Sequence, residues 1–95
     1  MVVKFLQLTK ERIVTGGWCQ GIYGDVRGSG PVCLSGAMHS VYPIYDDLRH
    51  TATNLLLELL PKHCGIVTFN DATTTTKEDV LKLIDKAILK AEEES

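Results

Sequence analysis

Apolar residues recur at helical spacing in several stretches of this chain. The clearest stretch spans residues 44–60, with apolar side chains at steps of three and four: Ile44, Leu48, Ala52, Leu55, Leu56, Leu59 and Leu60. This spacing places them on one face of a helix with a period of 3.6 residues. Because proline cannot donate a backbone hydrogen bond, we expect this helix to end before Pro61.

The N-terminal third predicts a helix followed by a loop. Apolar residues within 3–14 share one helical face, although the first few would also permit a short strand. Gly16 and Gly17 are expected to end this helix, because glycine adopts the left-handed conformation without penalty. Residues 21–30 contain four glycines among polar residues, which is typical of an exposed loop.

Two further helices are expected. Proline suits the first turn of a helix, so we predict a short helix from Pro31 to Val41, before Pro43. Thr76 and Asp79 have the spacing of a capping box ahead of an apolar helical face. The last helix should therefore begin at about Lys77.

Residues 66–69 are β-branched or aromatic and predict a short buried extended segment, whose partner could be residues 18–23. The pattern as a whole predicts one mostly α domain over residues 1–95, with four helices and this extended segment or a two-stranded hairpin. An α+β domain is the alternative. A chain of 95 residues has room for one core, and 44% hydrophobic and 23% charged residues are ordinary for a globular protein.

Net charge and hydropathy limit the classes of partner that this protein could bind. A net charge of −2 offers no basic field for many phosphates, so we expect no long nucleic acid as partner. A small anion remains compatible, because a helix N-terminus can bind one or two phosphates. Purely apolar runs such as residues 55–57 are far shorter than the roughly 20 residues that cross a bilayer, so no membrane segment is expected.

The three cysteines, Cys19, Cys33 and Cys64, are widely spaced and odd in number, and no signal segment opens the chain. We expect reduced thiols in a cytoplasmic protein. The Cys and His spacing is a weak match to a zinc site, and no glycine run matches a P-loop or a dinucleotide fingerprint. No metal and no cofactor are predicted.

The run from Asn70 to Thr76 is the first candidate site. It precedes a well-marked helix start, where unpaired N–H groups and the helix dipole favour an anionic or hydroxyl-rich ligand. Alternatively, Asn70 or Asp71 forms an Asx turn and Thr76 caps the helix, which would satisfy the same donors internally. The ligand-binding candidates in this run are Asn70, Asp71, Thr74, Thr75 and Thr76.

Residues 18–21, Trp-Cys-Gln-Gly, are the second candidate site. Trp18 could stack on a planar ligand while Gln20 hydrogen-bonds its edge, with Gly21 giving flexibility. The alternative is that Trp18 packs into the core and Gln20 pairs with nearby backbone.

Cys33 is the candidate nucleophile, because a helix N-terminus would lower the pKa of its thiol. His39 lies six residues along the same predicted helix and points away, so a base would have to be His50 or His63. A buried cysteine that acts as a small hydrophobic residue is the alternative.

In order, the chain carries Trp18-Cys19-Gln20-Gly21, Cys33-Leu34 with Gly36-Ala37, Asn70-Asp71-Ala72 before the threonines, and Glu78-Asp79-Val80 with Ala87. It thereby resembles a family of small uncharacterised proteins from actinobacteria and their phages. The resemblance implies a helix before W-x-Q-G, a C-x-x-G-A helix and an N-D-A turn that opens the last helix, and no activity. The chain departs from it in the glycine loop and in the threonine run, where relatives often carry Gly or Arg.

These observations support three functional hypotheses. The first is a non-enzymatic homo-oligomer that binds a small anionic or nucleotide ligand between the two candidate sites, for example a phage-type protein that sequesters a nucleotide signal. The second is an interaction module that inhibits a host enzyme through an apolar face. The third is a cysteine-dependent hydrolase that uses Cys33.

Overall fold

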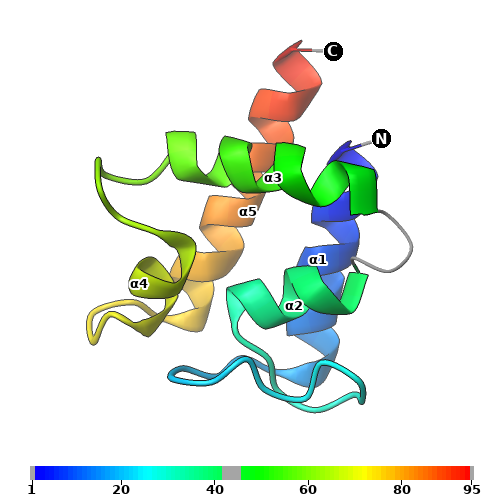
Figure 1. The fold of residues 1–95 in the computed structure, drawn as a ribbon, viewed down its shortest axis with the longest axis vertical. Helices are drawn as coiled ribbons and strands as arrows, with labels where there is room; N and C mark the ends of the chain where they lie inside the picture. Colours follow the sequence, from blue (N-terminus) through cyan, green and yellow to red (C-terminus); the bar gives the residue numbers. More distant parts are fainter. Residues whose placement is uncertain (1, 42–45, 95) are drawn as a thin grey trace.

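The computed structural model describes residues 2–41 and 46–94, and within these ranges the chain forms five α-helices (Figure 1). They are α1 (Val2–Gly16), α2 (Leu34–Val41), α3 (Asp46–Glu58), α4 (Ile66–Asp71) and α5 (Lys77–Glu94). The prediction of a mostly α fold is confirmed. Ile44, the first residue of the helix predicted over residues 44–60, lies outside the described ranges. No helix in these ranges is both long and apolar enough to cross a membrane.

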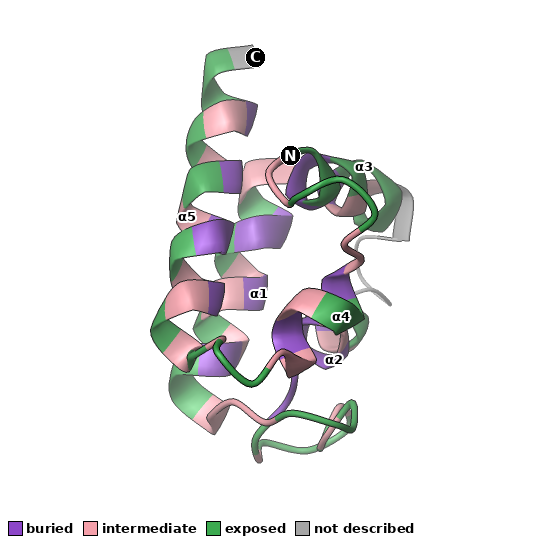
Figure 2. Ribbon diagram, turned by 90° about the vertical axis from the view of Figure 1, so that its left-hand side faces the viewer, coloured by how far each residue is buried: buried purple, intermediate pink, exposed green. Residues whose placement is uncertain are grey.

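The helices enclose one hydrophobic core. α1 and α5 run side by side in opposite directions, α3 crosses them near one end, and α2 packs on α1 (Figure 1). The buried faces of α1 and α5 turn toward the interior (Figure 2). Fully buried core side chains come from four of the helices: Phe5, Leu6 and Ile13; Leu34 and Ala37; Ala52 and Leu56; Val80, Ile84 and Ala87.

Helix α1 ends at Gly16 and Gly17, as predicted. Gly17 has a φ of 99° and donates its N–H to the carbonyl of Ile13 at 2.8 Å, a conformation that glycine adopts without a Cβ clash. The loop over residues 21–30 is exposed, as predicted, and a side chain of α1 is hydrogen-bonded to it. Arg12 Nη2 donates to the carbonyl oxygens of Asp25 (2.7 Å) and Gly28 (3.0 Å).

The predicted start of α2 was wrong by three residues. Val32 is extended, since its N–H donates to Gly17 and its carbonyl accepts from Cys19, both at 3.1 Å. The carbonyl of Pro31 accepts the N–H of Asp25 at 2.9 Å. These pairings satisfy the backbone outside a helix, so α2 begins at Leu34.

The prediction of an extended segment at residues 66–69 was also wrong, because they form most of α4. Ile66 and Asn70, four residues apart, are buried on one side of this helix, while Val67 is 48% exposed. An extended strand would instead bury alternate residues. The isolated bridges in the described residues join Val32 to Trp18 and Gly24, so residues 18–23 do not pair with α4. Without a partner strand, the β-branched residues adopt the helix that buries Ile66 and Asn70.

The predicted capping box at α5 is confirmed. The N–H of Thr76 donates to Asp79 Oδ2 at 3.0 Å, and the N–H of Asp79 donates to Thr76 Oγ1 at 3.2 Å. Two of the donors that a helix start leaves unpaired are thus satisfied by side chains. Helix α5 begins at Lys77, the predicted residue.

Candidate functional site

The two polar motifs meet at the side chain of Asn70, which is fully buried. Its Oδ1 accepts the indole N–H of Trp18 at 2.7 Å and the backbone N–H of Leu34 at 2.9 Å. Its Nδ2 donates to the carbonyl of Cys19 at 3.1 Å. One amide therefore joins α4 to the segment after α1 and to the start of α2.

Gln20 and Asp71 extend this network. Gln20 Nε2 donates to the carbonyl oxygens of Asn70 and Ala72, both at 2.9 Å. Asp71 Oδ1 accepts the N–H of Gly21 and the Nδ2 group of Asn70, also at 2.9 Å. Both hydrogen bonds favour the ionised carboxylate and therefore lower the pKa of Asp71. The bond from Gly21 has the larger effect. Trp18 packs against the core and Gln20 bonds to the backbone of Asn70 and Ala72, which is the structural alternative stated for residues 18–21. The side chain of Asn70 forms no Asx turn, because it bonds to Trp18, Cys19 and Leu34.

The threonines lie outside this network. Thr76 caps α5, and Thr75 donates its N–H to the carbonyl of Ala72 at 3.0 Å. Thr74 is exposed. The structure therefore brings Trp18, Gln20 and Gly21 to Asn70 and Asp71, but not to Thr74, Thr75 or Thr76. Asn70 and Asp71 are the last residues of α4 and do not open α5, so the turn that the resemblance implies at these residues is replaced by the end of a helix.

Cys33 caps α2 with its side chain. The N–H of Gly36 donates to Cys33 Sγ at 3.2 Å, where serine or threonine would usually supply the acceptor. Burial raises the pKa of this thiol and outweighs the backbone hydrogen bonds from Gly36 and Ser35 that lower it. We expected from the sequence that the helix N-terminus would lower the pKa of Cys33, and that expectation was wrong because burial raises it. The thiol also lines a small cavity in which no histidine is among the described lining residues.

Gly36 brings the loop against this helix start. A Cβ at Gly36 would overlap the carbonyl oxygen of Tyr23 and would lie 3.0 Å from its carbonyl carbon. The same carbonyl accepts the N–H of Cys33 at 3.1 Å. The absent side chain of Gly36 therefore allows Tyr23 to sit over α2.

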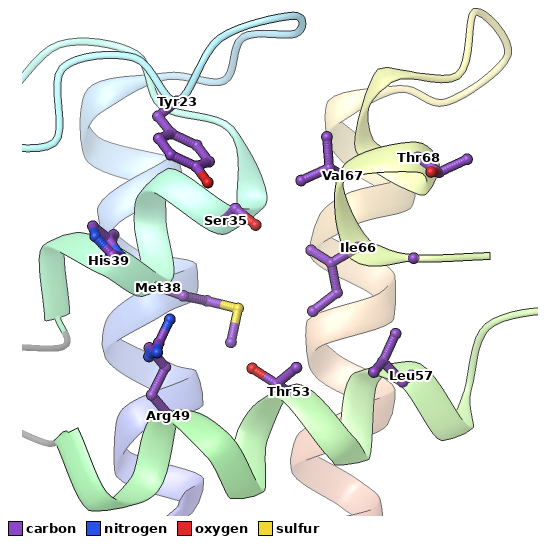
Figure 3. A pocket seen from close by; sticks show the side chains of 11 residues that line it. Tyr23, Ser35, Met38, His39, Arg49, Thr53, Leu57, Ile66, Val67 and Thr68 are labelled. Carbon is purple, nitrogen blue, oxygen red and sulfur yellow. The ribbon is translucent and has the colours of Figure 1, made fainter. Parts of the chain in front are cut away.

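The cleft that contains Arg49, called the main cleft below, has a volume of about 410 Å³ and lies between α2, α3 and α4. In Figure 3, α2 and Tyr23 form one wall, α4 forms the opposite wall and α3 forms the floor. The sulfur of Met38 points into the space, and Arg49 extends from α3 toward His39 (Figure 3). The other lining residues are Ser35, Thr53, Leu57, Gly65, Ile66, Val67 and Thr68.

The cleft combines apolar walls with a few polar groups. Arg49 carries a positive charge, Ser35 and Thr53 carry hydroxyl groups, and none of the described lining residues is acidic. The rings of Tyr23 and His39 stack with centroids 6.0 Å apart and an interplanar angle of 21°. Arginine donors suit a carboxylate or phosphate, and aromatic rings suit a planar or apolar group. Among the described residues, no three His, Cys, Asp or Glu side chains lie close enough together to hold a metal ion.

Sequence reasoning missed this cleft. Its floor is a stripe of α3, Arg49, Thr53 and Leu57, at successive steps of four residues. Such a stripe is a visible signal, because side chains four residues apart lie on the same helical face. The face opposite them on α2 depends on tertiary packing, which the helical period alone does not reveal.

No curated protein and no solved structure matches this chain. The model of one family, described as a family of unknown function (DUF6197), matches residues 2–90. Because that match covers nearly the whole chain, the protein belongs to the DUF6197 family.

Proposed function

We propose that this protein is a binding module that holds a small anionic ligand in the cleft between α2, α3 and α4. The observation that carries the proposal is the lining, in which Arg49 and two hydroxyl groups lie among apolar walls. Small-molecule sites typically measure roughly 300–1,000 Å³ and place a few polar groups in a largely apolar cavity. The cleft, at about 410 Å³, fits this description.

A nucleotide is the ligand class that suits the lining best. Its phosphate would face Arg49, and its base would lie near the stacked rings of Tyr23 and His39. A phage-type protein that sequesters a nucleotide signal is one concrete form of such a module. The hydrogen-bond network around Asn70 then supports the cleft by fixing α4, the wall opposite α2.

We do not extend the proposal to hydrolysis by Cys33. Its thiol is 4% exposed, its pKa is raised, and it already accepts a hydrogen bond from Gly36. A cysteine nucleophile requires an accessible thiolate and a nearby base.

The test is calorimetry with inorganic phosphate, nucleotides and cyclic nucleotides. We expect at least one nucleotide to bind, and Arg49→Gln to weaken that binding at least tenfold. Arg27→Gln removes the same charge from the exposed glycine loop and should leave the affinity unchanged. Silence across the whole panel would contradict the proposal, and so would equal affinities of Arg49→Gln and the wild-type protein.

Protein binding is a second candidate function, favoured by the distribution of exposed apolar side chains. Four large ones line the cleft or the small cavity beside it: Ile22, Tyr23, Leu57 and Val67, exposed by 69, 57, 40 and 48%. We call these four residues the apolar rim. A contiguous apolar surface of this kind is typical of an interaction site. The homo-oligomer expected from the sequence would use the same surface.

Sedimentation velocity distinguishes this second function. If the rim joins copies of the chain, the wild-type protein will sediment as an oligomer and the Ile22→Glu, Val67→Glu double variant as a monomer. Val14→Glu and Leu89→Glu change exposed apolar residues outside the rim, at 52 and 60% exposure, and serve as controls. Unchanged sedimentation of the double variant would exclude the rim as the oligomer contact.

A further inference from the structure

A second cavity adjoins the main cleft. Its volume is about 310 Å³, and it is lined by Gly21, Ile22, Tyr23, Cys33, Val67 and Asp71. Tyr23 and Val67 also line the main cleft, so a ligand in that cleft can extend past these two side chains into the second cavity. Small-molecule sites typically measure roughly 300–1,000 Å³, so a space at the lower end of this range suits one part of a nucleotide, such as its base.

Tyr23 and Val67, the side chains common to both spaces, offer surface on which a base can pack. They lie on opposite walls of the main cleft, Tyr23 beside α2 and Val67 on α4 (Figure 3). Tyr23 is 57% exposed and Val67 is 48% exposed, so both present ring or methyl surface to a ligand. Proteins that bind a single base commonly hold its plane between aromatic and apolar side chains. These two residues therefore suit a planar base without selecting which one.

Asp71 supplies an acceptor at the inner side of the second cavity. The N–H of Gly21 and the Nδ2 group of Asn70 both donate to Oδ1, each at 2.9 Å. In the part of the chain that the structure describes, no donor reaches Oδ2, and none of the residues lining this cavity is basic. The two bonds to Oδ1 lower the pKa of Asp71, so its carboxylate is ionised at neutral pH. Oδ2 therefore presents its lone pairs to a ligand with N–H groups.

Among the common bases, guanine best matches an acceptor of this kind. Its Watson–Crick edge presents two N–H donors side by side, at N1 and at the exocyclic N2. Adenine and cytosine place a ring nitrogen with a lone pair beside their amino group, and an ionised carboxylate, which only accepts, opposes that lone pair. Uracil and thymine have a single N–H between two carbonyl oxygens, which a carboxylate opposes as well.

We infer that the ligand is a guanine nucleotide, whose base lies between Tyr23 and Val67 and donates N1–H and N2–H to Asp71 Oδ2. This inference rests on the proposed function, in which the phosphate lies in the main cleft, and it names the base. Hydrogen bonds to an ionised acceptor are roughly twice as strong as bonds between neutral groups. Packing on Tyr23 and Val67 thus gives affinity for any base, and Asp71 gives the specificity.

The first test compares bases on the wild-type protein. Calorimetry is performed with GMP, IMP and AMP, and with the 3′,5′-cyclic monophosphates of the same three nucleosides, so that the phosphate is constant within each series. The inosine nucleotide differs from the guanosine nucleotide only in lacking the 2-amino group, which removes one of the two donors. In at least one series we expect the guanine nucleotide to bind at least tenfold more tightly than the other two.

The second test reverses the recognition with Asp71→Asn. The amide oxygen of this variant can still accept the N–H of Gly21, and its NH₂ group then replaces Oδ2. A donor there opposes the N2 amino group of guanine but matches the C2 carbonyl oxygen of xanthine. We expect at least a tenfold loss of affinity for the guanine nucleotide and a preference for the xanthine nucleotide of the same series. Glu93→Gln removes the same charge from the exposed end of α5 and should bind like the wild-type protein.

The outcomes separate this inference from the proposed function. Equal affinities for the three bases, or tighter binding of a nucleotide with another base, would overturn the guanine assignment and leave the proposed function standing. An Asp71→Asn variant that binds the guanine nucleotide like the wild-type protein would exclude Asp71 as the acceptor. Silence of every nucleotide and of inorganic phosphate would remove both the proposed function and this inference.

Discussion

At the scale of single residues, Asn70 is the side chain on which most of the polar architecture depends. Asn70→Ala would leave three groups without partners: the Trp18 indole N–H, the Leu34 N–H and the Cys19 carbonyl. Each unsatisfied buried group costs about 1–3 kcal/mol. Because the bond to Leu34 is buried and the other two are partly buried, we expect a loss of about 1–3 kcal/mol in the free energy of unfolding, measured in urea. Thr74→Ala, an exposed change in the next turn, should be nearly neutral, and equal stability of the two variants would refute this role.

Asp71 predicts a pH dependence of stability. Its pKa is lower in the folded chain than the value of about 3.9 typical of unfolded aspartate, so the ionised carboxylate stabilises the fold above about pH 4. This contribution is lost as the pH falls through the folded pKa. Asp71→Asn does not titrate, so its urea stability should change less than that of the wild-type protein between about pH 5 and pH 2. Identical pH profiles for Asp71→Asn and the wild-type protein would contradict the prediction.

The burial of Cys33 predicts that its thiol reacts slowly with alkylating reagents. Since burial covers the thiol and raises its pKa, iodoacetamide at pH 7 should alkylate Cys33 more slowly than the partly exposed Cys19 and Cys64 in the native protein. Mass spectrometry of the labelled peptides measures the three rates. In urea the three rates should become similar, because burial is then lost. Faster native labelling of Cys33 than of the other two would revive the hydrolase hypothesis.

At the scale of elements, α4 is a helix whose β-branched and aromatic residues favour an extended conformation. Thr68 is an exposed residue of this helix at the edge of the cleft. Alanine has a higher helix propensity than threonine by about 0.5 kcal/mol, so Thr68→Ala should raise the free energy of unfolding by up to that amount. In an extended segment the same change would lower stability, because alanine is disfavoured there. Urea unfolding decides between the two, with the exposed Thr73→Ala outside any helix as the control.

The elements also show where sequence reasoning succeeds. Residues 48–58 and 77–91 were predictable because repeated apolar positions and a capping box act locally, within a few residues. Residues 66–69 and the start of α2 were not, because distant backbone decided them. Val32 pairs with Gly17 and Cys19, and α4 is positioned by the bonds of Asn70 to Trp18 and Leu34, which lie 52 and 36 residues away.

At the scale of the whole molecule, the meeting of the two polar motifs was predicted, while the cleft was not. The two motifs are recognisable in the sequence by their unusual residue types. Only their contact with each other depends on the fold. The cleft instead arises from ordinary helical residues, Arg49 and Thr53 on α3 and Ser35 on α2, that face one another only after the helices pack. A helical period identifies a face, but the partner of that face is a property of the fold.

The bonds of Asn70 also have a consequence for the dynamics of the domain. Its oxygen accepts from Trp18 and Leu34, which lie 52 and 36 residues away in the chain, so one side chain closes two long loops. Release of α4 would free both donors in the same event. We therefore expect the Trp18 indole and Leu34 amide hydrogens to exchange with deuterium through one shared opening, with equal opening free energies by NMR. Unequal values would mean that the domain opens at these two places independently.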